Sequence, residues 1–178
     1  MLADLTAMAP LDRRRWVLGH AITPALAELP PMPSEAAARV MLLAIAGVES
    51  GCYARVQVPV AHARGLWQFE RGGGVAGVLA HRATAAHAAA ACRRRQIPAT
   101  ADEAWRALER DDVLAAIFAR LLLLTDPAAL PSGPDAGHAC YVRTWRPGAW
   151  DRGTAEARAK LRAKWADNWR MAATVCAE

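Results

Sequence analysis

The sequence has few of the residues that mark metal centres, disulfide scaffolds and membrane spans. Its four cysteines are widely spaced with no CxxC pair, and its five histidines form neither an HExxH motif nor an i,i+4 pair. We therefore expect reduced thiols and neither a metal nor a cofactor. The longest apolar run, residues 40–48, lies between Arg39 and Glu49 and is far shorter than the roughly 20 residues that cross a bilayer.

Motifs for serine nucleophiles and dinucleotides are also missing. None of the three serines lies in a GxSxG elbow, which argues against an α/β-hydrolase. Residues 72–77 match GxGxxG, but no βαβ pattern surrounds them and the next acidic residue is Asp102. The glycines therefore indicate a flexible turn before a helix rather than a dinucleotide site.

The 178 residues, 54% of them hydrophobic, can form one domain with a substantial core. The net charge of +5 favours an anionic partner. Seven tryptophans stand against two tyrosines and two phenylalanines. Because a Trp ring offers a flat face and one N–H donor, this excess fits contact with a partly polar ligand, or else packing in a helical core.

Ala, Leu, Arg and Glu dominate, so we predict a mainly α fold with at most a very small β element. Ser34 is the expected N-cap of a central, buried helix. We predict one domain, divided into an N-terminal helix and linker (1–33), a core (34–150) and a basic C-terminal helix (151–178). Helices are expected at residues 11–29, 35–49, in a short segment ending near 81, and at 83–95, 101–110, 113–124, 138–145 and 154–173, with an extended piece at 56–60.

Glu49 is the most informative single residue. It closes the most apolar helix and is followed by Ser50-Gly51. The negative end of the helix dipole and apolar neighbours both favour the neutral acid, which a general acid needs near neutral pH. The alternative is a Glu that points to solvent from a frayed helix end.

A second segment, Gly65-Leu66-Trp67-Gln68-Phe69, follows after a loop. The Gln68 amide can donate to and accept from a sugar hydroxyl, and Trp67 could stack on a sugar ring. Taken alone, the segment is equally an ordinary loop. Together with Glu49-Ser50-Gly51, it resembles the lysozyme-like family of lytic transglycosylases and goose-type lysozymes, with Trp67 where that family usually has Met. The resemblance covers residues 34–70 and extends more loosely to residue 145.

The resemblance implies a lysozyme-like helical domain with Glu49 as catalytic acid/base. It implies that Ser50, Trp67 and Gln68 bind substrate, and that Tyr141 hydrogen-bonds the catalytic Glu, although the family's Ala-Tyr-Asn segment is here Ala139-Cys140-Tyr141. Trp145 is expected near the far wall of the cleft. The remaining tryptophans are assigned to packing: Trp16, Trp105, Trp150, Trp165 and Trp169.

Glu70 is the nearest further carboxylate. It could face the cleft and contact substrate, or it could cap a helix or pair with Arg64 or Arg71, and we favour this structural role. In the family that the chain resembles, lytic transglycosylases use one Glu, which protonates the glycosidic oxygen and then removes the C6 hydroxyl proton to give a 1,6-anhydro sugar.

These features predict a peptidoglycan-degrading glycosidase, a lytic transglycosylase or muramidase, that cleaves the β-1,4 MurNAc–GlcNAc bond. Residues 141–148 are similar to segments of bacteriophage lysozyme-like proteins. We therefore expect a phage lysin made in the host cytoplasm that reaches the wall through a holin or within a virion, with glycan strands and virion proteins as partners. The alternative is a non-catalytic protein of the same fold that binds nucleic acid through Arg93, Arg94, Arg95 and the basic C-terminal helix.

Overall fold

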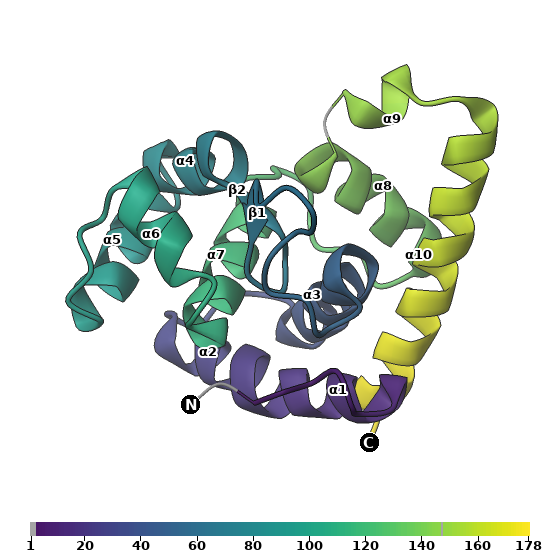
Figure 1. Ribbon diagram of the computed structural model, residues 1–178, viewed down its shortest axis with the longest axis horizontal. Helices are drawn as coiled ribbons and strands as arrows, with labels where there is room; N and C mark the ends of the chain where they lie inside the picture. Colours follow the sequence, from purple (N-terminus) through teal and green to yellow (C-terminus); the bar gives the residue numbers. More distant parts are fainter. Residues whose placement is uncertain (1–2, 147) are drawn as a thin grey trace.

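The computed structural model describes residues 3–146 and 148–178 and consists mainly of α-helices around one small antiparallel sheet (Figure 1). This confirms the predicted mainly α class with a very small β element. No helix in the described ranges is both long and apolar enough to cross a membrane.

The chain begins with a helical run that contains a π-helical turn. Helix α1 (Pro10–Val17) passes into the π-helical turn Leu18–Ile22 and then into α2 (Thr23–Glu28). The turn lies just before Pro24, which has no N–H to donate and disturbs the regular hydrogen-bonding pattern of a helix. The single helix predicted at residues 11–29 is thus three consecutive segments.

Helix α3 (Glu35–Ser50) forms the centre of the core, as its apolar sequence predicts. Ser34 occupies the N-cap position, but its side chain makes no capping hydrogen bond. The helix ends at Gly51, which adopts the left-handed conformation (φ 63°) that glycine accepts without strain. Glu49 therefore lies in the last helical turn, next to a sharp change of chain direction.

Helix α10 (Ala155–Cys176) runs along α3 and also contacts α1 and α8 (Figure 1). The close approach depends on Gly47, where an added Cβ would overlap the side chain of Asn168. The buried Asn168 accepts a hydrogen bond from the buried guanidinium of Arg14. Helices α1 and α10, from opposite ends of the chain, therefore both pack against the helix that carries Glu49.

The remaining elements follow α3 along the chain, and most of them pack on α7 or on one another. They are β1 (Ala63–Arg64), β2 (Phe69–Glu70), the π-helical turn Arg71–Val75, α4 (Ala76–Ala80), α5 (Ala85–Arg94), α6 (Ala101–Ala107), α7 (Asp112–Leu124), α8 (Pro134–Trp145) and α9 (Ala149–Arg152). Helix α7 is almost wholly buried. The strands pair Ala63 with Glu70 and Arg64 with Phe69.

Three local predictions differ from the structure. The extended piece expected at 56–60 is reduced to one bridge between Val56 and Arg64, since Pro59 has no N–H and the Val58 side chain is 85% exposed. Helix α8 begins at Pro134, earlier than predicted, because proline fits the first helical turn. The short α9 was not predicted.

Candidate functional site

A cavity of about 670 Å³ opens beside the C-terminal end of α3. Its wall combines residues from the end of α3, the β1–β2 hairpin, the glycine-rich turn after it, and the ends of α7, α8 and α9. The polar residues that line it are Glu49, Gln57, Gln68, Glu70, Thr144, Arg146 and Arg152. The apolar and glycine positions are Ala63, Phe69, Gly73, Gly74, Leu122 and Trp145. This is a cavity of ordinary ligand-binding size, with carboxylates, amides and guanidinium groups on one wall.

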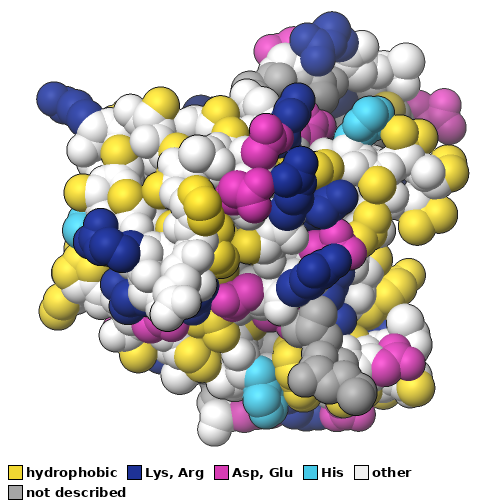
Figure 2. All heavy atoms as spheres, turned by 60° about the vertical axis from the view of Figure 1, so that its left-hand side comes forward, with side chains coloured by type: hydrophobic (Ala, Val, Ile, Leu, Met, Phe, Trp, Pro, Cys, Tyr) yellow, Lys and Arg dark blue, Asp and Glu magenta, His cyan; other side chains and the backbone are white. Residues whose placement is uncertain are grey.

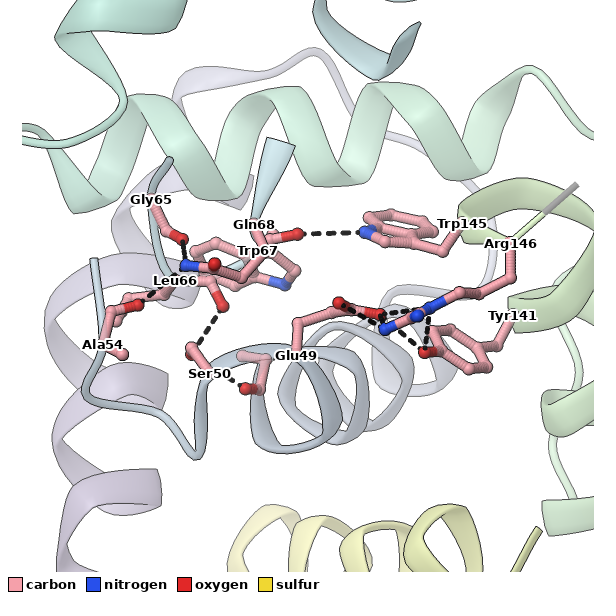
Figure 3. A network of polar contacts seen from close by, with 11 residues as sticks. Glu49, Ser50, Ala54, Gly65, Leu66, Trp67, Gln68, Tyr141, Trp145 and Arg146 are labelled. Atoms are coloured by element: carbon pink, nitrogen blue, oxygen red, sulfur yellow. Dashed lines mark hydrogen bonds and ion pairs between the residues drawn. The ribbon is translucent and has the colours of Figure 1, made fainter. Parts of the chain in front are cut away.

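Glu49 is the most buried charged group in this cavity wall and is held by two residues of α8 (Figure 3). The Tyr141 hydroxyl donates to its Oε1 at 2.5 Å. The Arg146 guanidinium donates to Oε2 through Nη2 at 3.0 Å, and to Oε1 through Nε at 3.2 Å and Nη2 at 3.1 Å. The carboxylate is thus directed by three donor groups and does not point freely into solvent, as a frayed helix end would allow.

Tyr141 is placed by aromatic packing. Its ring is fully buried and stacks on Trp165 of α10, with centroids 5.0 Å apart and planes inclined by 16°. Burial raises the pKa of the Tyr141 hydroxyl, and the neighbouring Glu49 carboxylate raises it further. The phenol therefore stays protonated and can act as a hydrogen-bond donor to Glu49. The structure brings Tyr141 to the catalytic candidate despite the altered sequence around it.

Arg146 occupies the C-cap position of α8, with a non-helical backbone. Burial lowers the pKa of its guanidinium, but the attraction of Glu49 and Tyr141 outweighs this and raises it overall. Arg146 was not among the site residues predicted from the sequence. The one feature of the sequence that could have identified it as a site residue is its position. It lies five residues after Tyr141 and directly before Pro147-Gly148, where a helix is expected to end.

The segment 65–68 is held in a tight turn below the cavity. Gly65 has φ 74°, and an added Cβ there would lie 2.8 Å from the Leu108 carbonyl oxygen. Gln68 also has positive φ, and its Nε2 donates to the carbonyl oxygens of Ala54 and Gly65, both at 3.0 Å. These bonds fix the amide, and Gln68 lines the cavity as predicted.

Two residues expected to bind substrate are buried instead. Trp67 is fully buried and donates from Nε1 to the Leu42 carbonyl oxygen, so its ring offers no face to a sugar. The Ser50 hydroxyl lies 3.0 Å from the Ala46 carbonyl oxygen and 2.7 Å from that of Leu66. The placements of Trp67 and Ser50 in the cleft were wrong: both join α3 to the segment below the cavity.

Trp145 lies in the cavity wall, as expected, and donates from Nε1 to the Trp67 carbonyl oxygen. The favoured structural role of Glu70 was wrong: it occupies the N-cap position of the π-helical turn Arg71–Val75, but its side chain makes no capping hydrogen bond there and pairs with neither arginine. Arg64 pairs with Glu109, and Arg71 with Asp102. Among the described residues Glu70 has no ion-pair partner, and it lines the same cavity as Glu49.

Other chemistries find little support near the cavity. Within residues 3–146 and 148–178, no group of three or more His, Cys, Asp or Glu side chains is placed to hold a metal. All four cysteines are free, and Cys140 is buried. Burial and, to a smaller extent, the neighbouring Asp126 together raise the pKa of the Cys140 thiol to about 11. The thiol is therefore a poor nucleophile at neutral pH.

Comparisons of the chain with protein-family models, with curated proteins and with solved structures find no match. Any assignment of function therefore depends on the residues of the cavity and their geometry.

Proposed function

We propose that the protein is a peptidoglycan glycosidase of lysozyme-like fold that cleaves the β-1,4 bond between N-acetylmuramic acid and N-acetylglucosamine. The observation that carries the proposal is Glu49, a carboxyl group that ends a buried helix, faces the cavity and is held by Tyr141. A single positioned carboxyl group, shielded from solvent beside a cavity, fits general acid catalysis at a glycosidic oxygen.

In the proposed reaction, neutral Glu49 gives its proton to the glycosidic oxygen as the bond from the muramic acid C1 to that oxygen breaks. The Glu49 carboxylate then accepts the proton of the C6 hydroxyl while this oxygen bonds to C1, which yields a 1,6-anhydro sugar. In the muramidase alternative, water takes the place of the C6 hydroxyl. Glu70, on the same cavity wall, would be the base for that water.

The charge distribution supports an anionic glycan. Arg146 and Arg152 both line the cavity, and the chain carries a net charge of +5. Peptidoglycan carries carboxylates on its lactyl and peptide groups, so its strands would be attracted.

The nucleic-acid alternative receives less support. Arg94 and Arg95 of the basic triplet pair with Glu28, and Arg95 also pairs with Asp111. Figure 2 shows basic and acidic side chains intermixed along the middle of one face. Paired arginines and a mixed surface would attract phosphates less than an unopposed basic patch.

The test is digestion of purified sacculi by the unmodified chain and by Glu49→Gln. We expect the unmodified chain to release soluble muropeptides and Glu49→Gln to lose about 10²- to 10⁴-fold of that activity, the usual contribution of general acid–base catalysis. Glu156→Gln, the same change at an exposed position on α10, should retain full activity. Mass spectrometry of the products separates anhydro from reducing ends, which differ by one water.

Two results would contradict the proposal in different ways. No release of muropeptides from any sacculus by the unmodified chain would refute the enzymatic function. Equal release by Glu49→Gln and Glu156→Gln would refute the assignment of Glu49 while leaving the activity to another residue.

A further inference from the structure

All four hydrogen bonds that the Glu49 carboxylate accepts come from donors of Tyr141 and Arg146. The Oε2 atom faces the Nη2 donor of Arg146 at 3.0 Å, and Oε1 faces both nitrogen donors of Arg146 and the Tyr141 hydroxyl. The Tyr141 oxygen itself accepts from Arg146 Nε at 3.1 Å, so its own proton is directed at Glu49. Every contact made by the carboxylate is thus with a donor, and Glu49 is ionised in this arrangement.

An ionised Glu49 cannot act as a general acid. For the reaction proposed above, the carboxyl group must carry a proton, and the Arg146 guanidinium must therefore leave it. Burial beside the negative end of the α3 dipole then favours the neutral form of Glu49, since no cation remains to offset the cost of a buried charge. Release of Arg146 and protonation of Glu49 are coupled.

Arg146 is the partner that can move. Its side chain is 41% exposed, whereas that of Glu49 is 9% exposed and fixed in the last turn of α3. Arg146 also lies at the end of α8 on the cavity wall, where a bound ligand would meet it. Among the described residues, its Nη1 makes no hydrogen bond, so a donor is available to an incoming group.

We propose that Arg146 selects anionic glycans: a carboxylate of the bound substrate takes the guanidinium away from Glu49, which then gains a proton from solvent and becomes the acid. This inference rests on the proposed function and deepens it. A guanidinium binds carboxylates in bidentate geometry, so the exchange replaces one ion pair with another of the same kind. The lactyl carboxylate of N-acetylmuramic acid meets the requirement, and a chitin strand, which lacks it, does not.

The charges balance in this exchange. Glu49 binds one proton from solvent, and the substrate carboxylate brings one negative charge to Arg146. The other ionisable groups that face Glu49 or share its cavity wall are Tyr141, Glu70 and Arg152. Arg152 adds a second cation to the lining of the cavity, whereas Glu70 adds a second carboxylate, which would repel an anionic group.

The test compares the cleavage of two glycans, peptidoglycan strands and a soluble chitin oligosaccharide, by the unmodified chain and by Arg146→Gln. We expect the unmodified chain to prefer peptidoglycan by at least about tenfold in kcat/KM, the value of one charge-assisted contact. In Arg146→Gln this preference should fall to near one, because cleavage of peptidoglycan loses the contact with its carboxylate, whereas cleavage of chitin rises once no guanidinium holds Glu49. Arg170→Gln, which removes an exposed arginine paired with Asp167, should keep the preference. Thermal unfolding of both variants checks that they are folded.

The outcomes separate the two proposals. If the unmodified chain cleaves peptidoglycan and Arg146→Gln keeps the preference for peptidoglycan over chitin, the role of Arg146 is refuted while the proposed function stands. If the unmodified chain cleaves neither glycan, the proposed function fails and this inference fails with it.

Discussion

Replacing Ser50 by alanine should destabilise the protein through a single lost hydrogen bond. The Ser50 hydroxyl is buried at the end of α3 and lies 2.7 Å from the Leu66 carbonyl oxygen, sixteen residues further along the chain. Leu66 is itself fully buried, and among the described residues its carbonyl oxygen has no other hydrogen-bond donor. The variant leaves that oxygen without a partner and without access to water.

The magnitude follows from this burial. An unsatisfied buried acceptor costs about 1–3 kcal/mol. Alanine has a higher helix propensity than serine, and at a helical position this difference offsets about 0.5 kcal/mol of the loss. The expected net loss in the free energy of unfolding is therefore about 0.5–2.5 kcal/mol. For a domain of 150–250 residues this lowers Tm by about 1–10 °C.

Denaturant and thermal unfolding of Ser50→Ala and Ser132→Ala measure the effect. Ser132 lies exposed in the loop before α8, so the same chemical change there should alter stability by less than about 0.5 kcal/mol. Equal stabilities of the two variants would refute the view that Ser50 joins α3 to the segment below the cavity.

Two further predictions concern groups near the core. Tyr141→Phe keeps the stacked ring but removes the donor to Glu49, so the rate of peptidoglycan cleavage should fall by about tenfold, the value of one hydrogen bond to a charged group; an unchanged rate would show that Arg146 alone positions the carboxylate. Burial raises the pKa of the Cys52 thiol from 9.0 to about 11, so the folded state holds this proton more tightly than the unfolded state. The resulting stability is complete below about pH 9 and is lost as pH rises through 11, by roughly 3 kcal/mol in total. Denaturant unfolding between pH 8 and 11 should therefore show a shallower loss in Cys52→Ala, and equal slopes would contradict this reading.

Much of the helical framework could be predicted because its signals are local. Apolar periodicity and a following glycine define α3, and the Asp111 and Thr154 side chains cap α7 and α10 as N-cap residues should. The strands could not be placed because each has only two residues. A pair that short depends on the turn between Gly65 and Gln68 and has no periodic pattern of its own.

The candidate site could be predicted only in part. Glu49 and Gln68 stand in local motifs, and both line the cavity. Trp67 stands in the same motif but points to the opposite side of its segment, and side-chain direction in a turn follows backbone angles that the sequence does not reveal. The pairing of Arg146 with Glu49 joins residues 97 positions apart, so only the packing of α8 near α3 brings it about.

The contact between Arg14 and Asn168 spans 154 residues of the chain. The contact lies next to Gly47, on the side of α3 that packs against α10. The apolar residues on that side are therefore covered only when α10 is in place. During synthesis α3 emerges well before α10, its principal neighbour. Part of the apolar surface of α3 therefore stays uncovered until α10 has been made, and the contacts of Glu49 form only after Tyr141 and Arg146 have been made.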